Sequence, residues 1–177
     1  MVCFPTSAIH YLQAQRVHFA THGALAGQLS PTSEPGLILT PPIVATGDGY
    51  LSASEIAGLK LDADWVILSA CNTAGGASPT GGRQDASGAE ALGGLARAFF
   101  YAQARSLLIS HWAVDSQATV RPITSAVGAM SSDKSVGRAE GLRRAMLAII
   151  DTDEPHQAHP ACWAPFVVVG EGAASKN

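Results

Sequence analysis

The chain has 177 residues, of which 47% are apolar and 14% are charged, with a formal net charge of −3. This length and apolar content predict one folded domain with a substantial core, not a disordered chain. The slight excess of acidic residues, without any run of Lys or Arg, argues against a nucleic-acid-binding surface.

Two further classes are excluded by the same inspection. No segment approaches the roughly 18 consecutive apolar residues of a membrane span, and the first residues lack the basic start and apolar block of a secretory signal. The cysteines, Cys3, Cys71 and Cys162, are odd in number and widely spaced, which is not typical of a disulfide framework. We therefore expect a cytoplasmic protein that binds neither membrane nor nucleic acid.

Short apolar segments alternate with segments of helical periodicity along the chain. In chain order, we expect a strand over 16–21, a helix over 52–59, a strand over 64–70, a helix over 87–104, a strand over 106–112, helices over 116–130 and 135–150, and a strand over 165–170. The strands are nearly continuous in apolar residues, which suits strands covered on both faces. The alternation predicts an α/β fold with a mostly parallel sheet flanked by helices.

Capping and turn residues mark the boundaries of these elements. The expected capping boxes are Ser52 with Glu55 and Ser87 with Glu90. The segments 26–50 and 72–88 are rich in Pro, Gly and small polar residues, and each follows a predicted strand. We expect both segments to be loops.

Two stretches of similar shape place a chemically active side chain just beyond a predicted strand. RVHFATHGAL reaches His22 and WVILSACNTAGG reaches Cys71. In an open parallel sheet, groups that follow the strands collect at the carboxyl edge, where ligands bind. If the two strands are neighbours, the imidazole of His22 and the thiol of Cys71 lie within reach of each other.

A cysteine and a histidine in contact can carry out nucleophilic catalysis. An imidazolium stabilises the thiolate, which is the nucleophilic form, and later donates a proton to the leaving amine. The N–H groups of Gly23 and Cys71 are candidate donors to the oxyanion, and Gly23 lets a substrate approach closely because it has no Cβ. The alternative interpretation is that Cys71 is a small core residue.

The other titratable residues have simpler interpretations. We expect His18, within a strand, to be packed or hydrogen-bonded. For His111, at the next strand end, packing is favoured over the alternative that it lines the cleft. The H-x2-H-x2-C spacing of His156, His159 and Cys162 lacks a fourth ligand, so no metal site is predicted. The arginines expected on a solvated helix face are Arg138, Arg143 and Arg144.

Five segments, taken together and in this order, are distinctive. They are VHFATHGAL, GYLSASEIAGLKL, ILSACNTAGG, GAEALGGLARAFFYAQARSLLISHWAVD and HPACWAPFVVVGEG. They resemble a CHAT domain, one of the caspase-like and separase-like cysteine peptidases. The resemblance implies a caspase-hemoglobinase α/β fold, with a catalytic dyad at the matching positions, His22 and Cys71.

The resemblance also implies a specificity residue. In separase-like relatives, an acidic residue near a strand-end Trp faces the P1 side chain of the substrate, and the matching segment here is Trp112-Ala113-Val114-Asp115. Asp115, with Trp112 beside it, is therefore expected in the S1 pocket, where it would select Lys or Arg. Asp115 is equally well placed to cap the helix that follows, and the two roles are compatible.

We divide the chain into an N-terminal extension or truncated remnant (1–15), a CHAT-like peptidase domain (16–172) and a tail (173–177). CHAT domains usually have more chain before the histidine strand. The predicted function is a cysteine-type endopeptidase that needs no cofactor and acts on a protein or peptide substrate. The resemblance also implies a helical-repeat sensor, on another segment or chain, as its partner. The alternatives are a non-catalytic interaction module of the same fold and a thiol acyltransferase.

Overall fold

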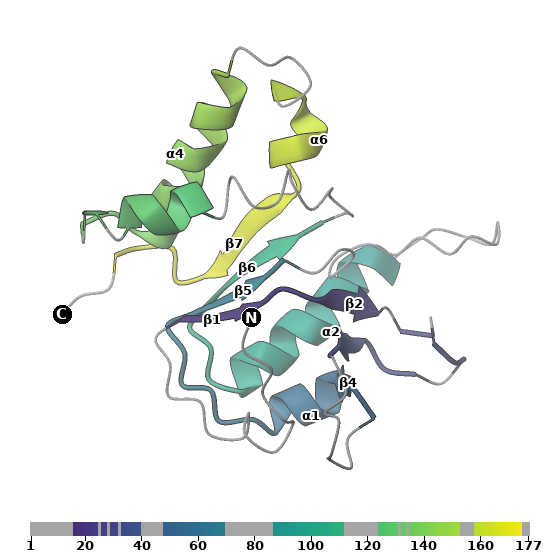
Figure 1. The fold of residues 1–177 in the computed structure, drawn as a ribbon. Helices are drawn as coiled ribbons and strands as arrows, with labels where there is room; N and C mark the ends of the chain where they lie inside the picture. The colour runs from purple at the N-terminus through teal and green to yellow at the C-terminus, as the bar shows by residue number, and fades with distance from the viewer. Residues whose placement is uncertain are drawn as a thin grey trace.

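The computed structural model describes residues 16–24, 26–27, 29–31, 33–39, 48–69, 87–111, 124–130, 132–133, 135–152 and 158–174, and within 87–93 only the backbone. The helices named here are α1 (Ala53–Ala57), α2 (Ser87–Tyr101), α4 (Arg138–Ile150) and α6 (Pro160–Trp163). A four-stranded sheet separates α1 and α2 from α4 and α6 (Figure 1). The predicted α/β class is confirmed.

The four-stranded sheet is mostly parallel. In order across the sheet, its strands are β1 (Arg16–Phe19), β5 (Trp65–Leu68), β6 (Ser106–Ser110) and β7 (Phe166–Gly170). β1 and β5 pair in parallel, as do β5 and β6, whereas β7 runs antiparallel to β6. Every residue of β5 and β6 is buried, as the apolar sequence of β5 and the apolar centre of β6 predict, and the burial includes Ser106 and Ser110 at the ends of β6.

Two hydrophobic clusters pack against opposite faces of this sheet. Side chains of a strand alternate between the faces, so neighbouring residues of β5 belong to different clusters. Val66 and Leu68 pack with residues of α1 and α2, whereas Trp65 and Ile67 pack with residues of α4. The central strand therefore ties both helical layers together.

The beginning of α1 is the capping box that the sequence predicts. Ser52 Oγ accepts a hydrogen bond of 3.3 Å from the Glu55 backbone N–H, and the Glu55 carboxylate accepts one of 2.8 Å from the Ser52 N–H. Two backbone donors that the helix itself cannot satisfy are thereby paired.

The other predicted helices agree with the structure in position but not at every end. α2 ends at Tyr101, short of the predicted 104, because Gln103 adopts a φ of 70°, which is outside the helical region. The side chains of its predicted capping pair lie outside the described set. Of the helix predicted over 116–130, the structure describes only 124–130, which is helical.

Among the described residues, no helix has the length and apolar character needed to cross a bilayer.

The prediction of a loop over residues 26–50 is wrong in part. A second, antiparallel sheet contains β2 (His22–Ala24), β3 (Gly36–Ile38) and β4 (Tyr50–Ser52), with β3 in the middle. Gly36 permits the close approach of β3 to β4, because a Cβ at Gly36 would lie 2.5 Å from the Leu51 carbonyl oxygen. Strands of three residues between prolines and glycines are too short to produce a periodic apolar pattern.

Candidate active site

The carboxyl ends of β1 and β5 lie side by side, which is the arrangement that a His22–Cys71 pair requires. Phe19, the last residue of β1, is opposite Leu68, the last residue of β5. A hydrogen bond of 3.2 Å from the Ser69 N–H to the Phe19 carbonyl oxygen continues the pairing past β5. The segments that lead to His22 and to Cys71 therefore leave the same edge of the sheet.

His22 lies beyond this edge as the first residue of β2. Because β1 ends at Phe19, the histidine is three residues past the strand, farther than the predicted strand over 16–21 implies. It pairs with Ile38 of β3, and the Thr21 hydroxyl donates a hydrogen bond to the Ile38 carbonyl oxygen. The small sheet thus fixes the backbone of His22, while its side chain is exposed to solvent.

Gly23 follows His22 in β2 and is half-buried opposite Leu37. The other residues assigned to the site, Cys71, Trp112 and Asp115, lie outside the described residues. They follow in sequence after β5 and β6, which are adjacent and parallel.

His111 stands directly after β6 and is exposed, so the prediction that it is packed is wrong. Its backbone N–H donates a hydrogen bond of 2.9 Å to the carbonyl oxygen of Pro165, the residue before β7. β6 ends at Ser110, two residues before the end of the apolar sequence pattern. The imidazole of His111 is therefore outside the buried part of the strand.

His18 is hydrogen-bonded, as predicted, and its partner is Ser69. The Nε2 atom of His18 lies 2.7 Å from Ser69 Oγ. Partial burial of the imidazole lowers the pKa of His18 below its ordinary value of 6.5, because burial disfavours the charged form. Ser69 is not among the predicted site residues, and the signal that marks it in the sequence is its place directly after an apolar strand and two residues before Cys71.

His159 has a structural role at the start of α6. Its Nδ1 atom accepts a hydrogen bond of 3.2 Å from the Ala161 N–H, so the imidazole caps this short helix. His156 lies outside the described residues, and the described part of the chain holds no group of three or more potential metal ligands.

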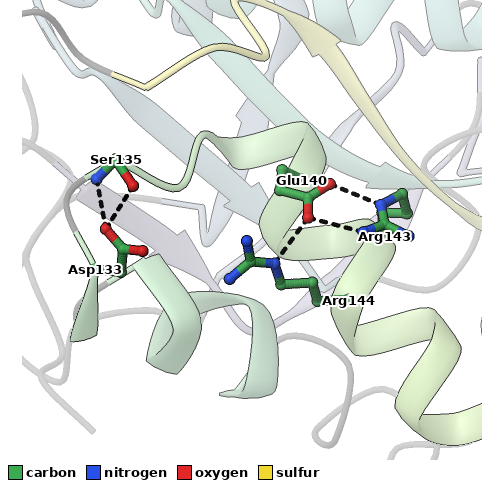
Figure 2. Close-up of polar contacts among 5 residues, drawn as sticks. All are labelled: Asp133, Ser135, Glu140, Arg143 and Arg144. Carbon is green, nitrogen blue, oxygen red and sulfur yellow. Dashed lines mark hydrogen bonds and ion pairs between the residues drawn. The ribbon is translucent and has the colours of Figure 1, made fainter.

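The arginines of α4 occupy two environments. Arg143 and Arg144 are exposed and donate hydrogen bonds of 2.6 and 2.7 Å to the Glu140 carboxylate, which lowers the pKa of Glu140 to about 2 (Figure 2). Arg138, in contrast, is only 5% exposed, and its Nη1 atom donates to the Glu171 carbonyl oxygen at 3.2 Å. The prediction of a solvated face is therefore correct for Arg143 and Arg144 and wrong for Arg138.

Asp133 and Ser135, which precede α4 in the chain, are also joined by hydrogen bonds. Asp133 accepts hydrogen bonds from the Ser135 N–H at 2.9 Å and from the Ser135 hydroxyl at 2.6 Å, as Figure 2 shows. These bonds lower the pKa of Asp133 and form a local turn before α4. The polar groups drawn in Figure 2 therefore form hydrogen bonds within the turn before α4 and within the first turns of this helix.

Comparison with known proteins shows which family the chain belongs to. The model of the CHAT domain family matches residues 6–171, which is nearly the whole chain and includes every described element. A search of the curated proteins finds no match. The family is related to the cysteine peptidases, and the mixed sheet flanked by helices is consistent with a caspase-like fold. The chain therefore belongs to the CHAT domain family.

Proposed function

We propose that the protein is a cysteine-type endopeptidase in which Cys71 is the nucleophile and His22 transfers the proton. The observation that supports this most directly is the parallel pairing of β1 with β5, which sends the segments bearing the two residues out of one sheet edge. The solvent exposure of His22 also suits a residue that must meet a peptide substrate.

The proposed reaction has two stages. His22 accepts the thiol proton of Cys71, and the sulfur attacks the scissile carbonyl carbon, so that negative charge develops on the carbonyl oxygen. The N–H groups of Gly23 and Cys71 donate hydrogen bonds to this oxygen. The C–N bond then breaks, the leaving amine takes the proton from His22, and a thioester remains on Cys71.

Water completes the cycle. His22 removes a proton from a water molecule, which attacks the thioester carbonyl carbon. The C–S bond breaks, the new carboxyl group leaves, and the proton returns to the sulfur. In the proposed S1 pocket, Trp112 forms a wall and the Asp115 carboxylate pairs with a Lys or Arg side chain of the substrate, which places the following peptide bond at Cys71.

The proposal is tested with fluorogenic peptides that carry Lys, Arg or a neutral residue at P1. We expect the native protein to cleave the Lys and Arg peptides, Cys71→Ala to abolish cleavage, and His22→Ala to reduce kcat by about 10²- to 10⁴-fold. Cys162→Ala is the matched control, since it removes a thiol on α6 and should leave cleavage unchanged.

The same experiment distinguishes the alternatives. Absence of cleavage for every P1 residue, together with alkylation of Cys71 no faster than that of an ordinary thiol, would contradict the proposal and favour a non-catalytic interaction module. Transfer of the peptide acyl group to an added amine in preference to water would indicate a thiol acyltransferase with the same dyad.

A further inference from the structure

A side-chain hydrogen bond joins the two segments that bear the proposed dyad. His18 Nε2 lies 2.7 Å from Ser69 Oγ. His18 precedes His22 by four residues, and Ser69 precedes Cys71 by two. The contact therefore crosses from the histidine segment to the cysteine segment just before each reaches the site.

The strand register explains why these side chains meet. His18 is opposite Ile67 in the parallel pairing of β1 with β5, and Ser69 is two residues beyond Ile67, which places it on the same face of the sheet. The imidazole is long enough to reach forward along this face to the hydroxyl group. The contact is thus a consequence of the sheet geometry.

Ser69 is held to β1 at three points. Besides the bond with His18, its backbone N–H donates to the Phe19 carbonyl oxygen at 3.2 Å and its hydroxyl lies 3.4 Å from the same oxygen. A neutral imidazole can accept the hydroxyl proton, or it can donate to the hydroxyl oxygen while that group donates to Phe19. Either arrangement fixes Ser69, the last described residue before Cys71.

We propose that His18 is a positioning residue for the nucleophile: by holding Ser69, it sets where Cys71 lies relative to His22. The inference rests on the proposed peptidase function and adds to it a histidine that does not touch the substrate. Displacement of a reacting group by about 1 Å can reduce a rate by about 10²-fold. Loss of the His18–Ser69 bond should therefore affect kcat much more than KM.

The test compares His18→Ala, Ser69→Ala and the double variant, using the P1 peptide that the native protein cleaves best. We expect each single substitution to lower kcat by roughly 10- to 100-fold, with little change in KM or in melting temperature. The double variant should be no worse than either single one, because the two side chains act through one contact. His18→Gln should recover most of the lost kcat, since its amide can still bond Ser69.

A second measurement does not depend on turnover. The rate at which iodoacetamide alkylates Cys71, followed by mass spectrometry, should fall in His18→Ala and recover in His18→Gln. The matched control is His159→Ala, which also removes a histidine hydrogen bond but at α6, and which should change neither kcat nor the alkylation rate. If His18→Ala fails to fold, Ser69→Ala, which removes only one oxygen atom, carries the test.

The outcomes separate the two proposals. Native protein without Cys71-dependent cleavage would overturn the peptidase function and the role of His18 with it. Native protein that cleaves, with kcat unchanged in both His18→Ala and Ser69→Ala, would overturn only the positioning role. Strictly additive losses in the double variant would also overturn it, because two independent residues would then be acting.

Discussion

His18 and His22 are four residues apart in the chain but lie in different surroundings. Both residues are exposed, but His18 belongs to β1 and bonds Ser69, whereas His22 opens β2. The difference follows from the point at which β1 ends, since residues 20 and 21 redirect the chain into the second sheet. One histidine thereby contacts the neighbouring strand segment of the large sheet, and the other belongs to the small sheet.

The lowered pKa of His18 predicts a pH dependence of stability. Below 6.5 the unfolded chain binds a proton that the folded imidazole accepts less readily, so this contribution is complete above 6.5 and is lost as the pH falls from there through the lower folded pKa. Melting temperatures measured between about pH 5 and pH 8 should fall on acidification, and less so in His18→Gln. Equal pH dependence in the two proteins would contradict the prediction.

Asp115 carries a prediction about specificity. If its carboxylate pairs with the P1 side chain, Asp115→Lys should abolish cleavage after Lys and Arg, because like charges would meet in the pocket. Asp115→Asn is the milder control, and it should weaken this preference without reversing it. Cleavage rates are measured beside circular dichroism spectra, and an unchanged P1 preference in a folded variant would remove Asp115 from the pocket.

At the residue scale, the sequence predicts the environment of a side chain where strand geometry determines it. It identifies His18 as packed or hydrogen-bonded, and the structure supplies its partner, Ser69. It fails at His111 and Arg138, because the exposure of a side chain at the end of an element depends on where the neighbouring chain passes. The segment containing Glu171 buries Arg138, and no local pattern reveals that approach.

At the scale of elements, short helices and strands depend on their boundary residues. α1 has only five residues, of which Ile56 is buried. Its capping box therefore contributes a substantial part of the stability of this helix. Only two residues, Ala20 and Thr21, connect β1 of the large sheet to β2 of the small one. Each sheet therefore constrains the other at the point where the candidate site begins.

The capping box of α1 predicts a measurable loss of stability. Ser52→Ala removes the acceptor for the Glu55 N–H and should reduce the free energy of unfolding by about 1 kcal/mol. Ser30→Ala, at an exposed turn position, is the control and should stay within about 0.5 kcal/mol of the native value. Urea titration measures both, and equal effects would show that the cap contributes nothing specific.

The elements also show which patterns a sequence reveals. β5 is apolar at every position, β6 is apolar at its three central positions, and α1 has both residues of its capping box, so each is predicted close to its observed place. β3 and β4 have three residues each and are missed. Their pairing depends on contacts with β2 and on the close approach at Gly36, which lie beyond the range of local periodicity.

At the scale of the whole molecule, the sheet is stabilised by helices on both faces. Phe99 of α2 is fully buried, and its ring centroid lies 5.5 Å from that of Phe19 in β1. This contact connects the helical layer to the strand that leads into the candidate site. The α/β class follows from the alternation of patterns, whereas the antiparallel direction of β7 depends on the connection that precedes it.

Truncation of Phe99 should greatly reduce the stability of the whole fold. Phe99→Ala should lower the free energy of unfolding by about 3–5 kcal/mol, because it leaves a cavity beneath the sheet. Phe100→Ala is a closely matched control, since Phe100 is the adjacent residue of the same helix and is 36% exposed, and its loss should be clearly smaller. Denaturant unfolding gives both values, and comparable losses would argue against the central position of Phe99 in the core.

The reversed direction of β7 has a practical consequence. Its last residue, Gly170, pairs with Ser106 at the start of β6, and the Glu171 N–H then bonds the Arg105 carbonyl oxygen at 3.1 Å. The polypeptide thus returns to the border of the sheet remote from His22. A dye or a sensor chip coupled after residue 174 should accordingly leave the border with the candidate site facing free solution, which suits surface-based tests of the proposed substrate binding.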